Sequence, residues 1–277
     1  MEHQERNKAP AVSVIMAVYQ IASARELDSA VSSILNQSFP DLELVICSDG
    51  ADEKTFSLLE KWHEKDGRVR VTRNVHNLGA GAARNRAAHL ASGQYIAIMD
   101  ADDVAAPTRL SQQLDFLKSN PRFDFVGSRG AYFSREPGDR PDGYWHVARP
   151  EPEDFLMTLP FVHASLMFRR EAFFAAGGYR ELKRVTRSED YDLLLRLYAL
   201  GLRGANLPEA LYFIRMDEAA QKRRKYRYRF FECAVKLEGF AKLGLMPRGI
   251  VYGLKPLAVG LIPSAILERI KRAYYRS

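Results

Sequence analysis

The segment Tyr95-Ile96-Ala97-Ile98-Met99-Asp100-Ala101-Asp102-Asp103 joins an apolar run to a cluster of acidic residues. An apolar run without alternation predicts a β-strand that is buried on both faces, as strands are in parallel sheets. Two earlier runs have the same form: residues 12–18 lead into Tyr19, and residues 42–47 are followed by Ser48-Asp49-Gly50. In parallel sheets, ligands bind at the carboxyl ends of the strands. The residues after these runs are therefore the first candidates for a functional site.

Helix and strand patterns alternate through the first hundred residues. Apolar residues at helical spacing predict helices over residues 24–36 and 55–65, an alanine-rich segment predicts one over residues 80–90, and a strand is expected over residues 68–72. This alternation predicts an α/β fold with a Rossmann-like, mainly parallel sheet flanked by helices. For the next hundred residues we expect strands at 123–127, 130–133, 164–168 and 211–214, a loop at 134–152 and a helix at 188–200.

The formal net charge of the 277 residues is +7, and it is unevenly distributed. Residues 1–220 contain 27 Lys and Arg against 31 Asp and Glu, whereas residues 221–277 contain 14 Lys and Arg against 3 Glu. We therefore expect an acidic body over residues 1–220 and a basic helical tail over residues 221–277, with breaks near Pro247, Pro256 and Pro263. Two cysteines are too few for a disulfide scaffold, and no apolar run reaches the roughly 20 residues of a spanning helix.

Two carboxylates, Asp100 and Asp102, follow the strand expected over residues 95–99. Carboxylate oxygens are the ligands that Mg²⁺ and Mn²⁺ prefer, and sites for these ions leave room for phosphate oxygens. The alternative is a solvated acidic turn before the helix that starts near Pro107, since Asp is a good helix cap. The candidate side chains at neighbouring strand ends favour the metal site.

Other candidate positions have two interpretations each. Asp49 precedes a glycine, and Asp-Gly is also a common turn signal. Arg84 lies near a helix start where a diphosphate could bind, or it is a surface arginine on an alanine-rich helix. Asp190 lies in a first helical turn, where it could be a general base or could simply favour the helix dipole. His163 precedes a strand, where a lone histidine is more often structural.

Several segments together resemble, in order, the sequence blocks of family 2 glycosyltransferases, which have the GT-A fold. The blocks are Ser13 to Tyr19, Gln37-Ser38-Phe39-Pro40 running into Leu44 to Gly50, Asn77-Leu78-Gly79 with Ala83-Arg84-Asn85, Tyr95 to Asp103 with its D-x-D motif, His163 to Arg170, Gly177-Gly178-Tyr179, and Glu189-Asp190-Tyr191-Asp192. Each motif is modest, but their order is specific. The resemblance covers about residues 11–216.

The resemblance implies an inverting transfer of a sugar from a nucleoside diphosphate sugar, a UDP-sugar first of all, with Mn²⁺ or Mg²⁺ as cofactor. The acceptor would be a hydroxyl of a glycan or lipid-linked acceptor in cell-surface polysaccharide or lipopolysaccharide synthesis. By resemblance, Tyr19 and Asp49 hold the nucleotide base, Asp100 lies near the ribose and the metal, Asp102 ligates the metal, and Asp190 deprotonates the acceptor. The residues assigned to the nucleotide sugar are Ala17, Val18, Tyr19, Asp49, Arg84, Asp100, Ala101 and Asp102, and those assigned to the acceptor side are His163, Glu189 and Asp190.

The sequence departs from the family pattern at two places. The family usually has two acids before the glycine that follows the second strand, whereas Ser48 precedes Asp49 here. Many relatives also carry a metal-ligating His shortly after the arginine that ends the last body strand. Here Arg215 is followed by Met216 and Asp217. Either Asp217 takes the place of this histidine as a metal ligand, or the site has one protein ligand fewer.

The tail combines Lys and Arg with Tyr over residues 222–229, and residues 249–263 are largely apolar. Short apolar helices flanked by cations predict attachment to a membrane surface through residues 221–277, which would place the enzyme in the cytoplasm, peripheral on the inner face of the cell membrane. The alternative is a helical hairpin packed on the body. Nucleic-acid binding would explain neither the apolar stretch nor the acidic body, so no nucleic-acid partner is expected.

Two other functions compete with the glycosyltransferase. A sugar nucleotidyltransferase usually has a Gly- and Arg-rich loop after its first strand, and Val18-Tyr19-Gln20 lacks it. A non-enzymatic, basic nucleic-acid-binding protein would use residues 221–277 and would not hydrolyse sugar nucleotides.

Overall fold

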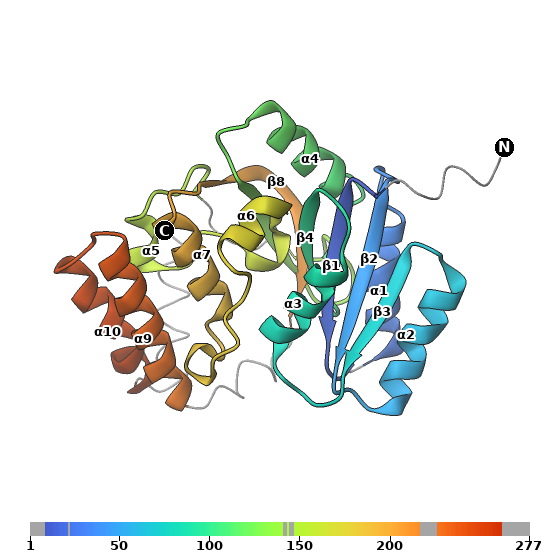
Figure 1. Cartoon of the computed structure of the whole chain (residues 1–277), viewed down its shortest axis with the longest axis horizontal. Coiled ribbons are helices and arrows are strands. Elements are labelled where there is room, and N and C mark those ends of the chain that lie inside the picture. Colours follow the sequence, from blue (N-terminus) through green and yellow to red (C-terminus); the bar gives the residue numbers. More distant parts are fainter. Residues whose placement is uncertain (1–8, 22, 141–142, 144–146, 217–225, 262–277) are drawn as a thin grey trace.

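In a computed structural model, the protein has an eight-stranded sheet in the order β3-β2-β1-β4-β7-β6-β8-β5 (Figure 1). The structure describes residues 9–21, 23–140, 143, 147–216 and 226–261. Strands β1, β2, β3 and β4 are parallel, β7 is antiparallel to β4 and β6, and β8 is parallel to β6 and antiparallel to β5. The strands are β1 (Val12–Val18), β2 (Leu42–Asp49), β3 (Val69–Asn74), β4 (Tyr95–Asp100), β5 (Val104–Ala105), β6 (Phe125–Phe133), β7 (Met167–Arg169) and β8 (Gly204–Arg215). The predicted α/β fold with a mainly parallel sheet is confirmed.

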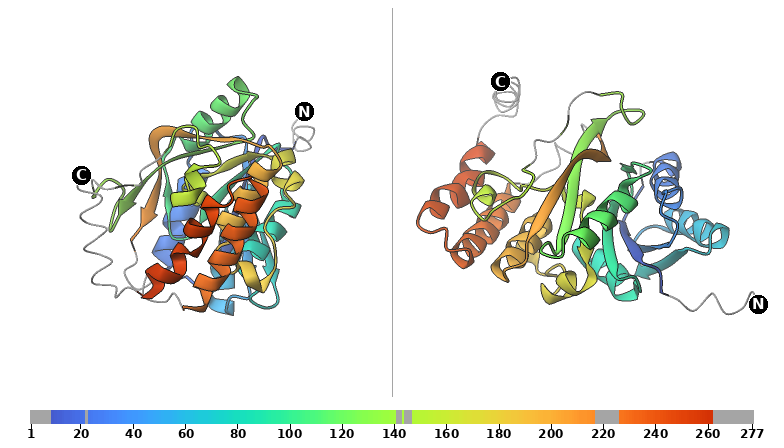
Figure 2. Two further views of the ribbon diagram at one scale, coloured as in Figure 1. Left: turned by 90° about the vertical axis from the view of Figure 1, so that its left-hand side faces the viewer. Right: turned by 90° about the horizontal axis from the view of Figure 1, so that it is seen from above.

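Helices cover both faces of this sheet, as Figures 1 and 2 show. Helices α1 (Ala24–Leu35), α2 (Glu53–Lys65) and α4 (Arg109–Ser119) pack on one face, and α3 (Ala80–Leu90), α6 (Arg170–Ala175) and α7 (Glu189–Ala199) pack on the other. In β1, Val14 and Met16 face the first group and Ile15 faces the second. Both faces are buried, which is why the strand has no polar alternation. The connections contain the short helix α5 (Asp154–Met157) and the 3₁₀ turns η2 (His163–Ser165) and η3 (Lys183–Val185).

The second half of the sheet differs from three sequence predictions. The strands expected over residues 123–127 and 130–133 are the single strand β6, which shifts register around Arg129. Strand β8 begins at Gly204 rather than at residue 211, because pairing with β6 overrides the poor strand propensity of a segment that contains Pro208. Pro208 lies between two paired positions, at a bulge where a missing N–H is tolerated.

The strand predicted over residues 164–168 is wrong at its start. Residues His163–Ser165 form the 3₁₀ turn η2, and β7 begins only at Met167. The Ser165 hydroxyl accepts the Ser128 N–H at 3.0 Å and donates to the Val162 carbonyl at 2.7 Å, so its own side chain stabilises the turn. This turn places His163 beside the end of β4 instead of in the sheet.

The described part of the tail consists of α9 (Arg227–Lys242) and α10 (Arg248–Leu261), which lie on the opposite side of the molecule from α1 and α2 (Figure 1). Helix α9 packs on α7: a Cβ on Gly239 would lie within 3 Å of the Leu195 side chain, and Glu238 forms an ion pair of 2.9 Å with Arg180. Helix α10 packs on α9. No helix in this part of the chain is long and apolar enough to cross a membrane.

The predicted break near Pro247 is confirmed, since α10 begins at the next residue. The break predicted near Pro256 is wrong, because α10 continues through this buried proline. Packing of the helix thus outweighs the loss of one backbone N–H donor. Residues 222–225 and Pro263 lie outside the described residues.

Candidate active site

A cavity of about 780 Å³ opens at the carboxyl ends of β1 and β4, and we call it the strand-end cavity. It is the edge at which parallel sheets bind ligands. Seven of the predicted nucleotide-sugar residues line it: Ala17, Val18, Tyr19, Arg84, Asp100, Ala101 and Asp102. Segments that are far apart in the sequence thus contribute to one cavity, as the strand order requires.

An ion pair lies at the inner end of this cavity. Arg84, from the second turn of α3, donates from Nη2 to Asp100 Oδ1 at 2.5 Å. Burial alone would lower the pKa of Arg84, but the Asp100 carboxylate raises it above its ordinary value. Burial raises the pKa of Asp100, but the Arg84 guanidinium outweighs this effect and the pKa is lowered. The Arg84 Nε is buried and has no hydrogen-bond partner within the described residues, so the guanidinium keeps one unsatisfied donor beside its ion pair with Asp100.

The next two acids have different environments. Asp103 is buried and accepts the Arg215 N–H at 2.8 Å, which joins the acidic turn to the end of β8. Burial, followed by repulsion from Asp100 and Asp102, raises the pKa of Asp103 to about 8. Asp102 is exposed in the cavity, yet the surrounding protein and Asp100 raise its pKa to about 6. Above about pH 6 the Asp102 carboxylate is ionised, and no cation among the described residues forms an ion pair with it.

This donor set fits a divalent cation. Asp102 offers an unpaired carboxylate beside a second carboxylate, and oxygen is the ligand type that Mg²⁺ and Mn²⁺ prefer. Among the described residues there is no group of three His, Cys, Asp or Glu side chains that could hold a metal ion. Asp217, the predicted additional ligand, lies outside the described residues.

Asp49 lies apart from the strand-end cavity, although the sequence predicts it to hold the base. Its buried carboxylate accepts from Asn74 Nδ2 at 2.8 Å, from the Leu78 N–H at 3.0 Å and from the Gly79 N–H at 2.8 Å. These bonds hold the loop that leads into α3. Asp49 therefore supports the start of α3, the helix that carries Arg84. Tyr19, the other residue predicted to hold the base, is half exposed in the strand-end cavity.

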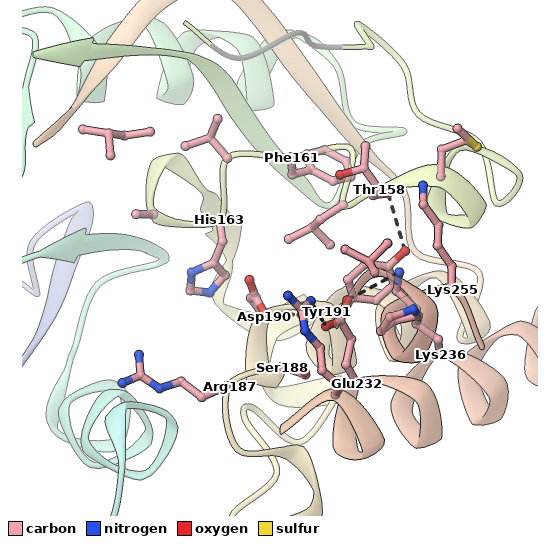
Figure 3. A pocket seen from close by; sticks show the side chains of 18 of the residues that line it. Thr158, Phe161, His163, Arg187, Ser188, Asp190, Tyr191, Glu232, Lys236 and Lys255 are labelled. Atoms are coloured by element: carbon pink, nitrogen blue, oxygen red, sulfur yellow. Dashed lines mark hydrogen bonds and ion pairs between the residues drawn. The ribbon is translucent and has the colours of Figure 1, made fainter. Parts of the chain in front are cut away.

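A second cavity of about 600 Å³, which we call the helix-side cavity, contains His163 and Asp190 (Figure 3). His163 Nε2 lies 2.8 Å from the hydroxyl of the buried Tyr179. Burial, and then the Arg84 guanidinium, lower the pKa of His163 to about 3, so its ring is neutral at pH 7. Burial, and then the neighbouring Glu189, raise the pKa of Asp190, which makes its ionised form a stronger base.

The other acids of the Glu189 block do not line either cavity. A Cβ on Gly81 would lie 3.5 Å from Glu189 Cγ, so Glu189 extends toward α3. Asp192 is fully buried and pairs with Arg180 and with Arg196 Nε, the latter at 2.8 Å. Within this block the structure thus places only Asp190 and Tyr191 in the helix-side cavity.

The two cavities meet at Asp100 and Arg187, which line both. The model of the family described as "Glycosyl transferase family 2" matches residues 13–178, which contain most of the strand-end cavity. This chain belongs to glycosyl transferase family 2. EpsE of Bacillus subtilis (strain 168), which is named as a glycosyltransferase, is 35% identical over 95% of this chain and 94% of its own length.

Two further comparisons place this glycosyltransferase among its relatives. The O-antigen biosynthesis glycosyltransferase WbnJ of Escherichia coli is 32% identical over 80% of this chain and 85% of its own length. The solved structure of the mannosyltransferase PcManGT from Pyrobaculum calidifontis, in complex with GDP-Man and Mn²⁺, superposes with a TM-score of 0.60. It is 20% identical, and the match covers 98% of this chain and 82% of that one. This likeness confirms the predicted GT-A fold.

The sequence interpretation missed one residue that lines the site of this glycosyltransferase, Arg187, and one that supports it, Arg109. Arg187 has φ +69°, a conformation that is costly for a residue with a Cβ, and it lies where the two cavities meet. Arg109 is fully buried and donates to the carbonyls of Ile98 at 2.8 Å and Ala164 at 3.2 Å, which ties β4 to the turn that carries His163. Neither arginine belongs to a motif block, so only their position in space reveals them.

Proposed function

We propose that this glycosyltransferase binds a nucleoside diphosphate sugar in the strand-end cavity and an acceptor hydroxyl in the helix-side cavity, and that it inverts the anomeric centre. The observation that carries the proposal is the contact of the two cavities at Asp100 and Arg187, with Asp102 on one side and Asp190 on the other. An in-line displacement needs a leaving group and a nucleophile on opposite sides of one carbon. This arrangement supplies a place for each.

In the proposed reaction, Asp190 accepts the proton of the acceptor hydroxyl. The hydroxyl oxygen forms a bond to the anomeric carbon, and the bond from that carbon to the diphosphate breaks with its electron pair on the diphosphate. Attack from the face opposite the leaving group inverts the centre. Arg84 and Arg187 both line the strand-end cavity, where their guanidinium groups are placed to bind the departing oxygens. A Mn²⁺ or Mg²⁺ ion held by Asp102 and Asp100 would neutralise charge that develops on the diphosphate.

The donor class and the metal are tested by thermal shift. We expect one member of a panel of UDP- and GDP-sugars to raise the melting temperature in the presence of Mn²⁺ and to do so much less without it. UDP-sugars are the first expectation from the sequence, and the GDP-Man complex of PcManGT is the reason to include GDP-sugars. NMR of the product's anomeric proton then tests inversion. A product with the donor's anomeric configuration would contradict the mechanism.

We further propose that the enzyme acts on a cell-surface glycan or its lipid-linked precursor at the inner face of the cell membrane. The name of WbnJ supports the acceptor class, and the outer side of α10 supports attachment, because Ile250, Val251, Leu254 and Leu261 are exposed there. Fractionation of cells tests this with the double variant Val251→Ser/Leu254→Ser. Leu90→Ser/Leu200→Ser removes exposed leucines elsewhere and is the matched control. Equal distribution of all three proteins would contradict membrane attachment.

A further inference from the structure

The helix-side cavity extends beyond Asp190 to helices α9 and α10, and its two ends differ in charge. Asp100, Asp103 and Asp190 line the end near the sheet, whereas Arg229, Lys236 and Lys255 line the far end with one carboxylate, that of Glu232. Figure 3 shows His163 and Asp190 at one end, with Lys236 and Lys255 beyond Tyr191 at the other. A ligand that fills this cavity therefore meets a base at one end and cations at the other.

Lys236 is an unusual lysine because it is only 4% exposed. Its Nζ lies 4.9 Å from the centre of the Tyr191 ring and 3.6 Å from Glu232 Oε1. Glu232 is shared, since Arg229 Nη1 lies 3.4 Å from its other oxygen. A buried ammonium is costly unless it is well paired. Burial lowers the pKa of Lys236; the Glu232 carboxylate opposes this effect, and repulsion from Lys255 adds to it.

Lys255 brings a second ammonium to the same end of the cavity. It is exposed, and it makes no hydrogen bond or ion pair with any of the residues that the structure describes. Within α10, Val251 and Val259 are four residues from Lys255 and share its side of the helix. Val259 lines the cavity with Met157 and Leu159, and Val251 is exposed outside it. The cations are thus bordered by apolar side chains that lead toward the protein surface.

We propose that Lys236 and Lys255 bind a phosphate group of the acceptor, so that the acceptor is a phosphate-bearing glycan or glycolipid whose sugar hydroxyl reaches Asp190. The inference rests on the proposed function, because it assigns the acceptor to the helix-side cavity. A phosphate has oxygens for both ammonium groups and supplies the negative charge that Glu232 alone does not. A lipid phosphate would extend along the apolar border, and a phosphate within a glycan would bind without using it.

Calorimetry on the full chain tests the proposal with dodecyl phosphate, inorganic phosphate and uncharged dodecyl maltoside below its micelle concentration. Mg²⁺ and a donor-derived nucleoside diphosphate are present in excess, so that the strand-end cavity is occupied. We expect Lys255→Gln to weaken the binding of dodecyl phosphate about tenfold, the usual effect of losing one charge-assisted hydrogen bond. Lys236→Gln, tested in parallel, should do the same. Arg248→Gln on α10 and Lys242→Gln on α9 remove exposed cations that do not line the cavity, and they should change binding less than about twofold.

The outcomes separate the inference from the proposed function. Unchanged affinity in Lys255→Gln, or an equal loss in Arg248→Gln, would overturn the phosphate site, the latter because it indicates attraction to the tail in general. If inorganic phosphate binds as tightly as dodecyl phosphate and shows the same loss in Lys255→Gln, the phosphate site stands without a lipid. The proposed function is checked independently by the metal-dependent thermal shift with nucleotide sugars. If no nucleotide sugar raises the melting temperature with metal, the proposed donor site is rejected. The effect of Lys255→Gln on the binding of dodecyl phosphate can still be interpreted in that case.

Discussion

Replacement of Asp190 by asparagine is the sharpest test of the catalytic assignment, because the two side chains have the same shape. The amide oxygen of the substituted side chain can still accept the Tyr191 N–H, which the Asp190 carboxylate accepts at 2.8 Å, so the start of α7 is retained. Loss of a general base typically costs about 10²- to 10⁴-fold in rate, which corresponds to roughly 3–5 kcal/mol of transition-state stabilisation. Donor affinity should be unchanged, since Asp190 does not line the strand-end cavity.

The same variant makes a prediction about stability. Burial raises the pKa of Asp190, so its ionised form disfavours the folded state at pH values above the folded pKa, and this penalty is absent below the unfolded pKa. Asp190→Asn should therefore melt at the same or a higher temperature than the parent at about pH 8, and the difference should vanish as the pH falls toward about 4.

The assay is turnover of the identified donor with its acceptor, together with thermal melting at several pH values. Asp115→Asn, an exposed carboxylate on α4, is the control for loss of one negative charge. Turnover of Asp190→Asn within about threefold of the parent would refute the role of this residue as base. If Asp190→Asn lowered donor affinity by as large a factor as it lowers turnover, this would refute the assignment of donor and acceptor to separate cavities.

Three further variants test the rest of the site. Asp102→Asn should remove most of the metal-dependent donor binding. In the parent protein, metal-dependent donor binding should weaken as the pH falls below about 6, because protons then compete with the metal for Asp102. Equal donor affinities at about pH 5 and pH 8 would contradict the assignment of Asp102 to the metal. Arg187→Gly should raise the free energy of unfolding by about 1 kcal/mol, because glycine adopts a φ of +69° without strain, and it should lower turnover because the guanidinium is lost. Stability is measured by denaturant unfolding and turnover by steady-state kinetics. A variant that is more stable and turns over as fast as the parent would argue against a binding role for Arg187. Asp192→Ala should destabilise the fold by about 3 kcal/mol, because it leaves Arg180 and Arg196 without their buried partner, and a loss below about 1 kcal/mol in urea titrations would contradict this.

The fold of the first hundred residues follows from local pattern. The bounds of β1 and α3 agree with the prediction, because the apolar run of β1 is continuous and the alanine-rich segment lies between Gly79 and Gly93. In the second half, pairing partners decide the structure. Gly204 to Ala210 has no strand pattern of its own, yet it extends β8 because β6 offers free backbone groups beside it. The 3₁₀ turn at His163 depends on a hydrogen bond from Ser128, 37 positions away in the sequence.

The sequence by itself determined the alternation of strands and helices, the acids at the ends of the strands and the division of charge between body and tail. These properties are local, and the rule that parallel strands end at one edge converts them into a site. Tertiary structure alone decided that Asp49 holds the loop before α3, that Glu189 does not line the helix-side cavity, and that Lys236 and Lys255 of the tail do. Side-chain direction and the docking of α9 on α7 depend on contacts between distant segments, and no short-range pattern encodes such contacts.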